Sequence, residues 1–244
     1  MNIVITGANG RMGRMLTQCA REAGHSIAAR VSPSFSGAEE AGCYASLAEF
    51  HGPADVLIDF SHHAATAELT AWCKARRLPA VIATTAQTEA ERALIEDAAK
   101  AIPVFLSANM SIGVALLAEM ARKAAAVFPD ADIEIIERHH NQKLDAPSGT
   151  ALMLARRMQE VRPEAELLLG RAGSGKRGRE IGIHAVRCGN EVGTHEIVIA
   201  NGGETLTLKH EAESRALFAQ GALAAAAFLL GRAPGLYDMR SLVE

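Results

Sequence analysis

The sequence predicts an α/β protein in which a doubly wound parallel sheet is combined with a second α+β lobe that contains an open mixed sheet. Three observations favour this class. Short apolar runs alternate with helical patterns early in the chain, a glycine-rich turn follows the first apolar run, and strand-like segments separated by turn residues come late. Strands and helices in alternation indicate parallel strands with helices on both faces of the sheet.

The elements of the first lobe follow from apolar periodicity. Expected strands are 2–6, 25–31, 56–60, 80–83 and 104–107, and expected helices are 11–22, 63–77 and 88–101. In the first helix, Met12, Leu16 and Cys19 recur at helical spacing. Thr88 is an expected N-cap, because Glu91 follows three residues later in the position of a capping box.

The pattern changes after residue 107. A long Ala-rich helix is expected over 112–128, ended by Pro129, and a strand over 132–136 runs into the charged stretch 137–145. A further helix is expected from about 149 to 161. The segment 170–179 holds four glycines and four basic residues, so it is predicted to be a mobile loop.

Three antiparallel strands are expected at 181–187, 194–200 and 204–210. Gly189-Asn190 and Asn201-Gly202-Gly203 separate them and suit tight hairpins. An open sheet of this kind must cover its apolar face, which predicts a subunit interface. The expected domains are therefore residues 1–110 with 216–244, which would bind a dinucleotide, and residues 111–215, which would bind substrate and oligomerise.

Composition indicates a globular cytoplasmic protein. The chain has 244 residues, is 49% hydrophobic and carries a net charge of -3, so bulk electrostatics suggest neither a nucleic-acid nor a membrane partner. Its longest apolar stretch, 218–230, is shorter than the ~18–20 residues of a membrane span. The four cysteines lack the spacing of a zinc site or a redox pair, and no secretion signal is visible, which favours free thiols in a reducing compartment.

The turn Gly7-Ala8-Asn9-Gly10-Arg11-Met12-Gly13 follows a strand and opens a helix. Glycines there let the backbone approach a pyrophosphate, and the N–H groups of the helix start attract its charge. A tight turn that binds nothing is the alternative. No acidic residue stands near Ser32 to bond the ribose hydroxyls, and Arg11, Arg30 and Ser32 suit a 2′-phosphate, so NADPH is expected to serve at least as well as NADH.

The segment 138–151 brings His139, His140 and Lys143 to the start of a helix at Ser148-Gly149-Thr150. An ammonium, a hydroxyl and unpaired backbone N–H groups can converge there on a carboxylate, and a histidine can transfer a proton near neutral pH. A solvated charged loop before a capped helix is the alternative. A metal site is disfavoured because adjacent histidines on a strand point to opposite faces.

Taken together, these motifs resemble those of the 4-hydroxy-tetrahydrodipicolinate reductase family over nearly the whole chain. The resemblance rests on 7–13, on 134–151, on shorter matches at 58–61, 83–85 and 108–111, and on the ending 235–240. It implies a Rossmann-type cofactor lobe, completed by the carboxyl-terminal segment, and a tetramerising substrate lobe.

The resemblance also implies roles for individual residues. His139 would be the proton donor or acceptor, Lys143 a proton donor, and His140, Lys143, Gly149 and Thr150 would bind the substrate's carboxylates. NADPH or NADH would be held by Gly7, Ala8, Asn9, Gly10, Arg11, Met12, Ser32, Ala83, Thr84, Thr85, Ala108, Asn109, Met110 and Ser111. Ser32 and Ala83 depart from the acidic residue and the glycine that are usual there, and His62 stands where a basic arginine is sometimes seen. These departures affect cofactor preference rather than the reaction.

The implied reaction reduces a small cyclic dicarboxylate of the lysine pathway: hydride reaches a conjugated ring carbon and the resulting enamine is protonated. Competing hypotheses are a related aspartate-type dehydrogenase and a non-catalytic dinucleotide sensor. A short-chain dehydrogenase is excluded, because neither Tyr44 nor Tyr237 is followed by lysine four residues on. The residues leave open the preference between NADH and NADPH, the hydroxylated or dehydrated form of the substrate, tetramer or dimer, and the extent of lobe closure.

Overall fold

The computed structural model describes residues 1–36 and 41–244. The chain forms two compact units. One comprises Met1–Ser111 with Ala216–Leu242 and Glu244, and the other comprises Ile112–Arg215 with Val243. Within the described residues, no helix combines the length and the apolar character that crossing a membrane requires.

The first unit is built on a fully parallel seven-stranded sheet. Its strands are β1 (Asn2–Thr6), β2 (Ser26–Val31), β3 (Cys43–Tyr44), β4 (Val56–Asp59), β5 (Ala80–Ile82), β6 (Pro103–Leu106) and β12 (Gly235–Tyr237). They lie in the order β12-β6-β5-β4-β1-β2-β3. The order reverses between β1 and β4, and in doubly wound sheets the crevice at that reversal, beyond the carboxyl ends of the strands, binds ligands.

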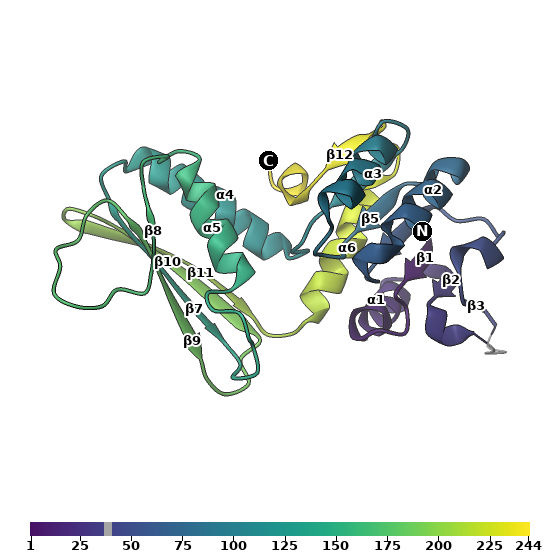
Figure 1. Ribbon diagram of the computed structural model, residues 1–244, viewed down its shortest axis with the longest axis horizontal. Coiled ribbons are helices and arrows are strands. Elements are labelled where there is room, and N and C mark those ends of the chain that lie inside the picture. Colours follow the sequence, from purple (N-terminus) through teal and green to yellow (C-terminus); the bar gives the residue numbers. More distant parts are fainter. Residues whose placement is uncertain (37–40) are drawn as a thin grey trace. The chain divides into compact units, whose positions relative to one another are not determined.

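Helices cover both faces of this sheet, which confirms the predicted doubly wound class (Figure 1). Helices α2 (Thr66–Arg76) and α3 (Glu89–Ala99) lie on one face, and α1 (Arg11–Glu22) and α6 (Ala216–Leu229) on the other. Short 3-10 helices occupy η1 (Pro33–Phe35), η2 (Leu47–Glu49), η3 (His63–Ala65) and η4 (Met239–Leu242).

The predicted capping box opens α3. The Thr88 hydroxyl accepts from the Glu91 amide at 3.2 Å, and the Glu91 carboxylate accepts from the Thr88 amide at 2.7 Å. Two otherwise unpaired N–H groups are thereby satisfied, which fixes where the helix begins.

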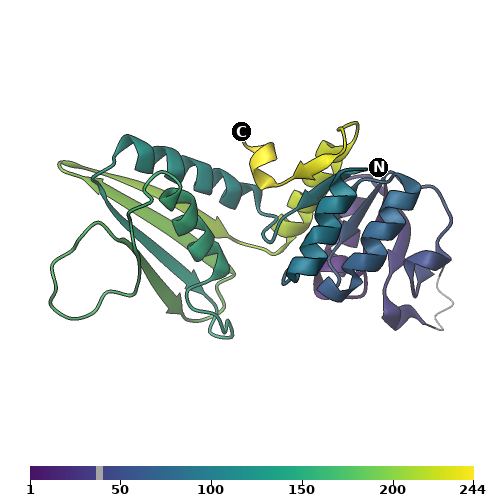
Figure 2. The ribbon, with the colours of Figure 1, turned by 45° about the horizontal axis from the view of Figure 1, so that its top comes forward.

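The second unit holds a mixed five-stranded sheet in the order β11-β10-β7-β9-β8, with α4 (Ile112–Val127) and α5 (Gly149–Gln159) packed on one face (Figure 2). The strands are β7 (Asp132–His139), β8 (Leu167–Leu169), β9 (Ile181–Arg187), β10 (Gly193–Asn201) and β11 (Glu204–Ala212). Alternate residues of β7 and β10, such as Ile133, Ile135 and Ile197, are fully buried beneath the helices. The other face carries the intervening, more polar residues.

Three sequence expectations for this unit need correction. The hairpin expected at Gly189-Asn190 is wrong, because β7 lies between β9 and β10, parallel to the first and antiparallel to the second. Turn residues dictate a reversal of the chain but not which strand fills the space beside it. Strand β8 was not expected, and β7 extends three residues beyond Ile136, so that His139 ends a strand instead of lying in a charged loop.

The hairpin at Gly202-Gly203 is confirmed, since Asn201 pairs with Glu204 and Gly202 adopts a positive φ of 62°. The segment 170–179 contains neither helix nor strand, as expected. It is nevertheless anchored, because the Arg177 guanidinium donates to the Ile133 carbonyl at 2.8 Å and to the Glu134 carboxylate at 3.2 Å.

Candidate functional site

A cleft of about 350 Å³ opens at the reversal of the first sheet. It is lined by segments that follow three neighbouring strands: Gly10, Arg11 and Met12 after β1; Phe60, Ser61, His62 and His63 after β4; and Ala83, Thr84 and Thr85 after β5. Segments 10–12 and 83–85, expected from sequence to act together, are thus neighbours. Residues 108–111 follow β6 at the same edge of the sheet but are not part of this lining.

Two glycines of the turn are required by backbone packing. Gly7 has a positive φ of 69°, and a Cβ there would lie 2.4 Å from the Phe60 carbonyl oxygen. A Cβ on Gly13 would lie 2.3 Å from the Gly7 carbonyl oxygen. These two positions would therefore demand glycine even without a ligand.

Gly10 has a different role, because it is the N-cap of α1 and lines the cleft. No side chain caps this helix, so its first N–H groups can be offered to an anion. The cleft, the glycine backbone and the helix start together fit a dinucleotide pyrophosphate, which argues against a turn that binds nothing.

Asp59 joins the three strand ends beneath the cleft. Its buried carboxylate accepts from the Thr6 hydroxyl at 2.6 Å, from the Thr84 hydroxyl at 2.6 Å and from the Ser61 amide at 3.0 Å. The Thr84 hydroxyl is therefore engaged within the protein. Sequence reasoning named Asp59 only as part of a motif and missed this contact, which needs three strands in register.

Polar side chains connect the glycine turn to the end of β2. The Asn9 amide donates to the Ser34 hydroxyl at 2.8 Å, and that hydroxyl lies 2.8 Å from the Ser32 hydroxyl. The Ala8 amide donates to the Val31 carbonyl at 3.1 Å. Asn9, which replaces the glycine common in such turns, thus braces the segment that contains Ser32.

His62, noted from sequence as a departure that bears on cofactor preference, lines the cleft together with His63, which was not singled out. Their ring centroids lie 4.2 Å apart, and the Nδ1 atom of His63 lies 2.9 Å from the Glu91 carboxylate. The sequence signal that could have found them is their position just after the carboxyl end of β4, at the edge where ligands bind.

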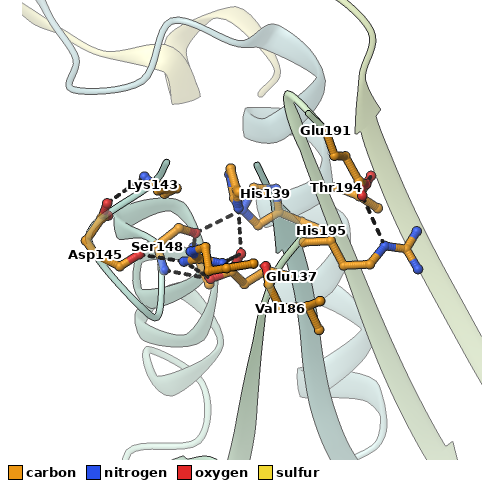
Figure 3. Close-up of polar contacts among 12 residues, drawn as sticks. Glu137, His139, Lys143, Asp145, Ser148, Val186, Glu191, Thr194 and His195 are labelled. Atoms are coloured by element: carbon orange, nitrogen blue, oxygen red, sulfur yellow. Dashed lines mark hydrogen bonds and ion pairs between the residues drawn. The ribbon is translucent and has the colours of Figure 1, made fainter. Parts of the chain in front are cut away.

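In the second unit, His139 is at the end of β7 and faces the helices with Glu137. The Nδ1 atom of His139 lies 2.5 Å from the Glu137 carboxylate (Figure 3). Glu137 is wholly buried and also accepts from the Ser148 amide at 2.9 Å and from the Arg187 guanidinium at 2.8 and 2.7 Å. Burial alone would raise the pKa of Glu137, but hydrogen bonds from His139, Arg187 and Ser148 outweigh it and lower that pKa to about 2.

His195 lies beside His139 on the neighbouring strand, with ring centroids 5.2 Å apart (Figure 3). Its Nε2 atom lies 3.1 Å from the Ser148 hydroxyl, which is also the N-cap of α5 and accepts from the Ala151 amide. Burial lowers the pKa of His195 to about 4, and repulsion from His139 adds to the effect. A neutral His195 therefore adjoins the His139 ring.

Lys143 lies in the loop before α5 and pairs with the Asp145 carboxylate at 2.8 Å (Figure 3). This ammonium is the main cause of a lowered Asp145 pKa, and the Gly149 backbone N–H contributes to the lowering. The Asp145 carboxylate is thus stabilised by Lys143 and by the start of α5. These are the same groups that were predicted to bind a carboxylate of the substrate. The space around Gly149 is open, whereas Thr150 and His140 are half-buried. The segment can therefore accept an anionic ligand.

Protonation of an acidic substrate needs an ammonium or a helix start for the anion and a histidine for the proton, and this unit contains groups of both kinds. No group of three or more His, Cys, Asp or Glu side chains placed to hold a metal ion occurs among residues 1–36 and 41–244. Sequence reasoning found His139, His140, Lys143, Gly149 and Thr150. It did not single out the partners Glu137, Arg187 and His195, which come from three different strands.

Comparisons with known proteins agree over the whole chain. Residues 1–110 match the family model described as dihydrodipicolinate reductase, N-terminus, and residues 113–243 match dihydrodipicolinate reductase, C-terminus. The 4-hydroxy-tetrahydrodipicolinate reductase of Caldanaerobacter subterraneus subsp. tengcongensis is 44% identical, covering 100% of this chain and 98% of the relative. That of Clostridium tetani is 42% identical, covering 100% and 97%.

Solved structures give a consistent picture. Dipicolinate-bound dihydrodipicolinate reductase from Paenisporosarcina sp. TG-14 superposes with a TM-score of 0.82 at 26% identity, covering 98% of this chain and 97% of that one. Aspartate dehydrogenase from Thermotoga maritima reaches a TM-score of 0.51 at 13% identity, covering 96% and 98%, a likeness of fold alone.

Proposed function

The chain belongs to the dihydrodipicolinate reductase family, and from this premise we propose how its residues carry out the reaction. The protein is an NAD(P)H-dependent oxidoreductase that reduces 4-hydroxy-tetrahydrodipicolinate to tetrahydrodipicolinate in lysine and diaminopimelate biosynthesis. The observation that carries this conclusion is agreement with the family over both units. An aspartate-type dehydrogenase, which shares only the fold, and a non-catalytic sensor are not favoured.

We propose that the cleft of the first unit holds the dinucleotide. Backbone N–H groups at Gly10–Met12 would bind the pyrophosphate, and 83–85 would line the path toward the nicotinamide. Residues 108–111 and Ser32 are proposed as further contacts. When bound, the dihydronicotinamide supplies the hydride; the protein's part is to bind, orient and exclude water.

We propose NADPH as a cofactor at least as good as NADH. Strand β2 ends at Arg30-Val31 and Ser32 follows it, so no carboxylate at this strand end repels a 2′-phosphate. A kinetic preference of more than about tenfold for NADH in kcat/KM, or about 1.4 kcal/mol in transition-state stabilisation, would contradict this.

In the second unit, His139 is proposed to donate or accept the proton, and Lys143 to donate one and neutralise a substrate carboxylate. His140, Gly149 and Thr150 would bind the substrate's carboxylates, aided by the N-terminus of α5. Because Lys143 is paired with Asp145, a substrate carboxylate must share or displace that partner. The positive end of the helix and the ammonium together favour the anion over water.

The decisive experiment is a coupled assay. Pyruvate and aspartate semialdehyde are condensed by a separate synthase, and oxidation of NADPH and then NADH is followed by absorbance. We expect oxidation that requires every component, and a fall in kcat/KM of about 100-fold or more in Lys143→Ala, the loss typical of an oriented charge or general acid.

Lys74→Ala is the matched control, since Lys74 also pairs with an aspartate, Asp97, at 2.5 Å but lies on α2 of the first unit. Full activity in both variants would refute the role of Lys143. No oxidation with either cofactor, despite dinucleotide binding, would refute the substrate.

We further propose a cytoplasmic homotetramer. The face of the second sheet opposite α4 and α5 presents Ile136, Val186 and Val198 among polar residues and is the candidate subunit interface. Analytical ultracentrifugation tests the assembly, and a purely monomeric species at micromolar concentration would contradict it.

A further inference from the structure

Glu137 breaks the burial pattern of its strand. Along β7 the residues that face the helices are Ile133, Ile135, Glu137 and His139, so a charged carboxylate follows two buried isoleucines and is itself 0% exposed. Burying an ionised carboxylate is costly unless it is paired and hydrogen-bonded. Its presence at this position therefore depends on the groups that surround it.

Those groups meet both carboxylate oxygens. Oε2 lies 2.5 Å from His139 Nδ1 and accepts from Arg187 at 2.8 Å, while Oε1 accepts from Arg187 at 2.7 Å and from the Ser148 amide at 2.9 Å. The forked guanidinium contact is the strong geometry for a carboxylate. Arg187 in turn donates to the Asp145 carbonyl at 2.5 Å, so the cation is held from two sides.

The carboxylate also decides which nitrogen of His139 carries a proton. With its pKa lowered to about 2, Glu137 is ionised at neutral pH and can only accept hydrogen bonds. Nδ1 must then be the donor, and Nε2 is left as the atom that exchanges a proton with a ligand.

The far side of the ring is fixed as well. A Cβ on Gly193 would lie 2.7 Å from His139 Nε2 and 3.0 Å from Cδ2. The ring therefore packs against the backbone at Gly193, where any side chain would collide with it. The edge-to-face contact with His195 restrains the ring further. The imidazole therefore has little freedom to turn.

We propose that Glu137 is the positioning residue of the reaction: it holds His139 as the Nδ1–H tautomer with Nε2 presented for proton exchange, and Arg187 keeps Glu137 charged. This inference rests on the proposed function, in which His139 exchanges the proton. It parallels the arrangement in which a buried carboxylate orients a catalytic histidine without itself being protonated.

The same strand offers a matched control on its other face. Glu134 also contacts a histidine, His184 at 2.8 Å, and an arginine, Arg177 at 3.1 Å. This trio is partly exposed and does not involve His139. Glu134→Gln therefore removes a comparable charge from β7 without touching Glu137, His139 or Arg187.

The test compares Glu137→Gln, Glu134→Gln, His139→Gln and the double variant Glu137→Gln/His139→Gln in the coupled assay. We expect Glu137→Gln to lower kcat about 100-fold while KM changes less than about threefold, because orientation and not binding is lost. Glu134→Gln should retain kcat. In the double variant, Glu137→Gln should lower kcat less than about threefold beyond the loss already caused by His139→Gln. The reason is that the two residues act together, so removing the second has little further effect.

The second readout is the ¹⁵N NMR spectrum of histidine-labelled protein, in which His139 is assigned by its loss in His139→Gln. We expect Nδ1–H alone in the wild type and a mixture of tautomers in Glu137→Gln. An unchanged tautomer, retained kcat in Glu137→Gln, or an equal loss in the His139→Gln background would overturn the inference. Retained kcat in His139→Gln would instead overturn the proposed function.

Glu137→Gln leaves the Arg187 charge without its partner, and such a loss is strongly destabilising. If that variant does not fold, Gly193→Ala tests the same idea with the carboxylate intact. The added methyl occupies the space of the His139 ring, so kcat should fall at least about tenfold in a protein of native circular dichroism. Full kcat in Gly193→Ala would overturn the inference.

Discussion

Lowering the pH from 7 to 5 should destabilise the protein by about 2 kcal/mol through His195 alone. Burial lowers the pKa of this histidine from 6.5 to about 4, His139 repels its charged form, and Glu137 only partly offsets these effects. Because the folded-state pKa is depressed, the unfolded chain binds more protons than the folded one between these values. Stability is therefore complete above about pH 6.5 and is lost as the pH falls toward 4.

The magnitude follows from the linkage relation. With pKa values of 6.5 unfolded and about 4 folded, the destabilisation is small at pH 7 and about 2 kcal/mol at pH 5. Glu137 contributes in a lower window. Its pKa is depressed from 4.5 to about 2, so its contribution is present above about pH 4.5 and is lost as the pH falls below that.

The assay is urea unfolding followed by circular dichroism at pH 7, 6 and 5 for the wild type and His195→Gln. Glutamine places a neutral amide near the position of Nε2 and does not titrate. The wild type should lose about 2 kcal/mol more than the variant between pH 7 and pH 5. Identical losses in the two proteins would refute the assignment of a buried, neutral His195.

Three further predictions concern the first unit. Thr88→Ala removes the capping box of α3 and should lower the free energy of unfolding by about 1 kcal/mol, measured with urea; an unchanged transition would contradict the cap. Gly7→Ala places a Cβ 2.4 Å from the Phe60 carbonyl and should weaken NADPH binding at least about tenfold by fluorescence titration. Gly24→Ala, with a positive φ of 75° but open space around it, is the control and should bind normally. Asp59→Asn keeps only one acceptor oxygen for the Thr6 and Thr84 hydroxyls and should cost about 1–3 kcal/mol of stability; a neutral effect would mean that these hydrogen bonds contribute nothing.

Local chemistry explains what the sequence predicted well. The strands and helices of the first unit, the glycine turn and the capping box at Thr88 each depend on residues within a few positions of one another. The same holds for the start of α5, where Ser148 caps the helix beside Gly149 and Thr150. Periodicity and capping are short-range effects, so the letters suffice.

Pairing between strands explains what the sequence predicted poorly. Gly189-Asn190 marks a reversal of the chain, but β7 occupies the place beside β9. The loop between β9 and β10 instead bonds to the end of β7, where the Cys188 amide donates to the His139 carbonyl at 3.0 Å. The strand β7 was expected to end at Ile136, because Glu137 and Arg138 look like the beginning of a charged loop. From sequence alone, a charged residue that is buried with partners cannot be distinguished from one that is exposed to solvent.

By itself, the sequence determined the α/β class and the glycine-rich turn, and it singled out the candidates His139 and Lys143, because each of these features depends on residues that are neighbours in the chain. Only the tertiary structure decided that Glu137 is buried, that Arg187, 50 residues further along the chain, keeps it charged, and that Asp59 gathers three strand ends. Those contacts depend on the register between strands, which is a property of the assembled sheet and is written in no local stretch of the chain.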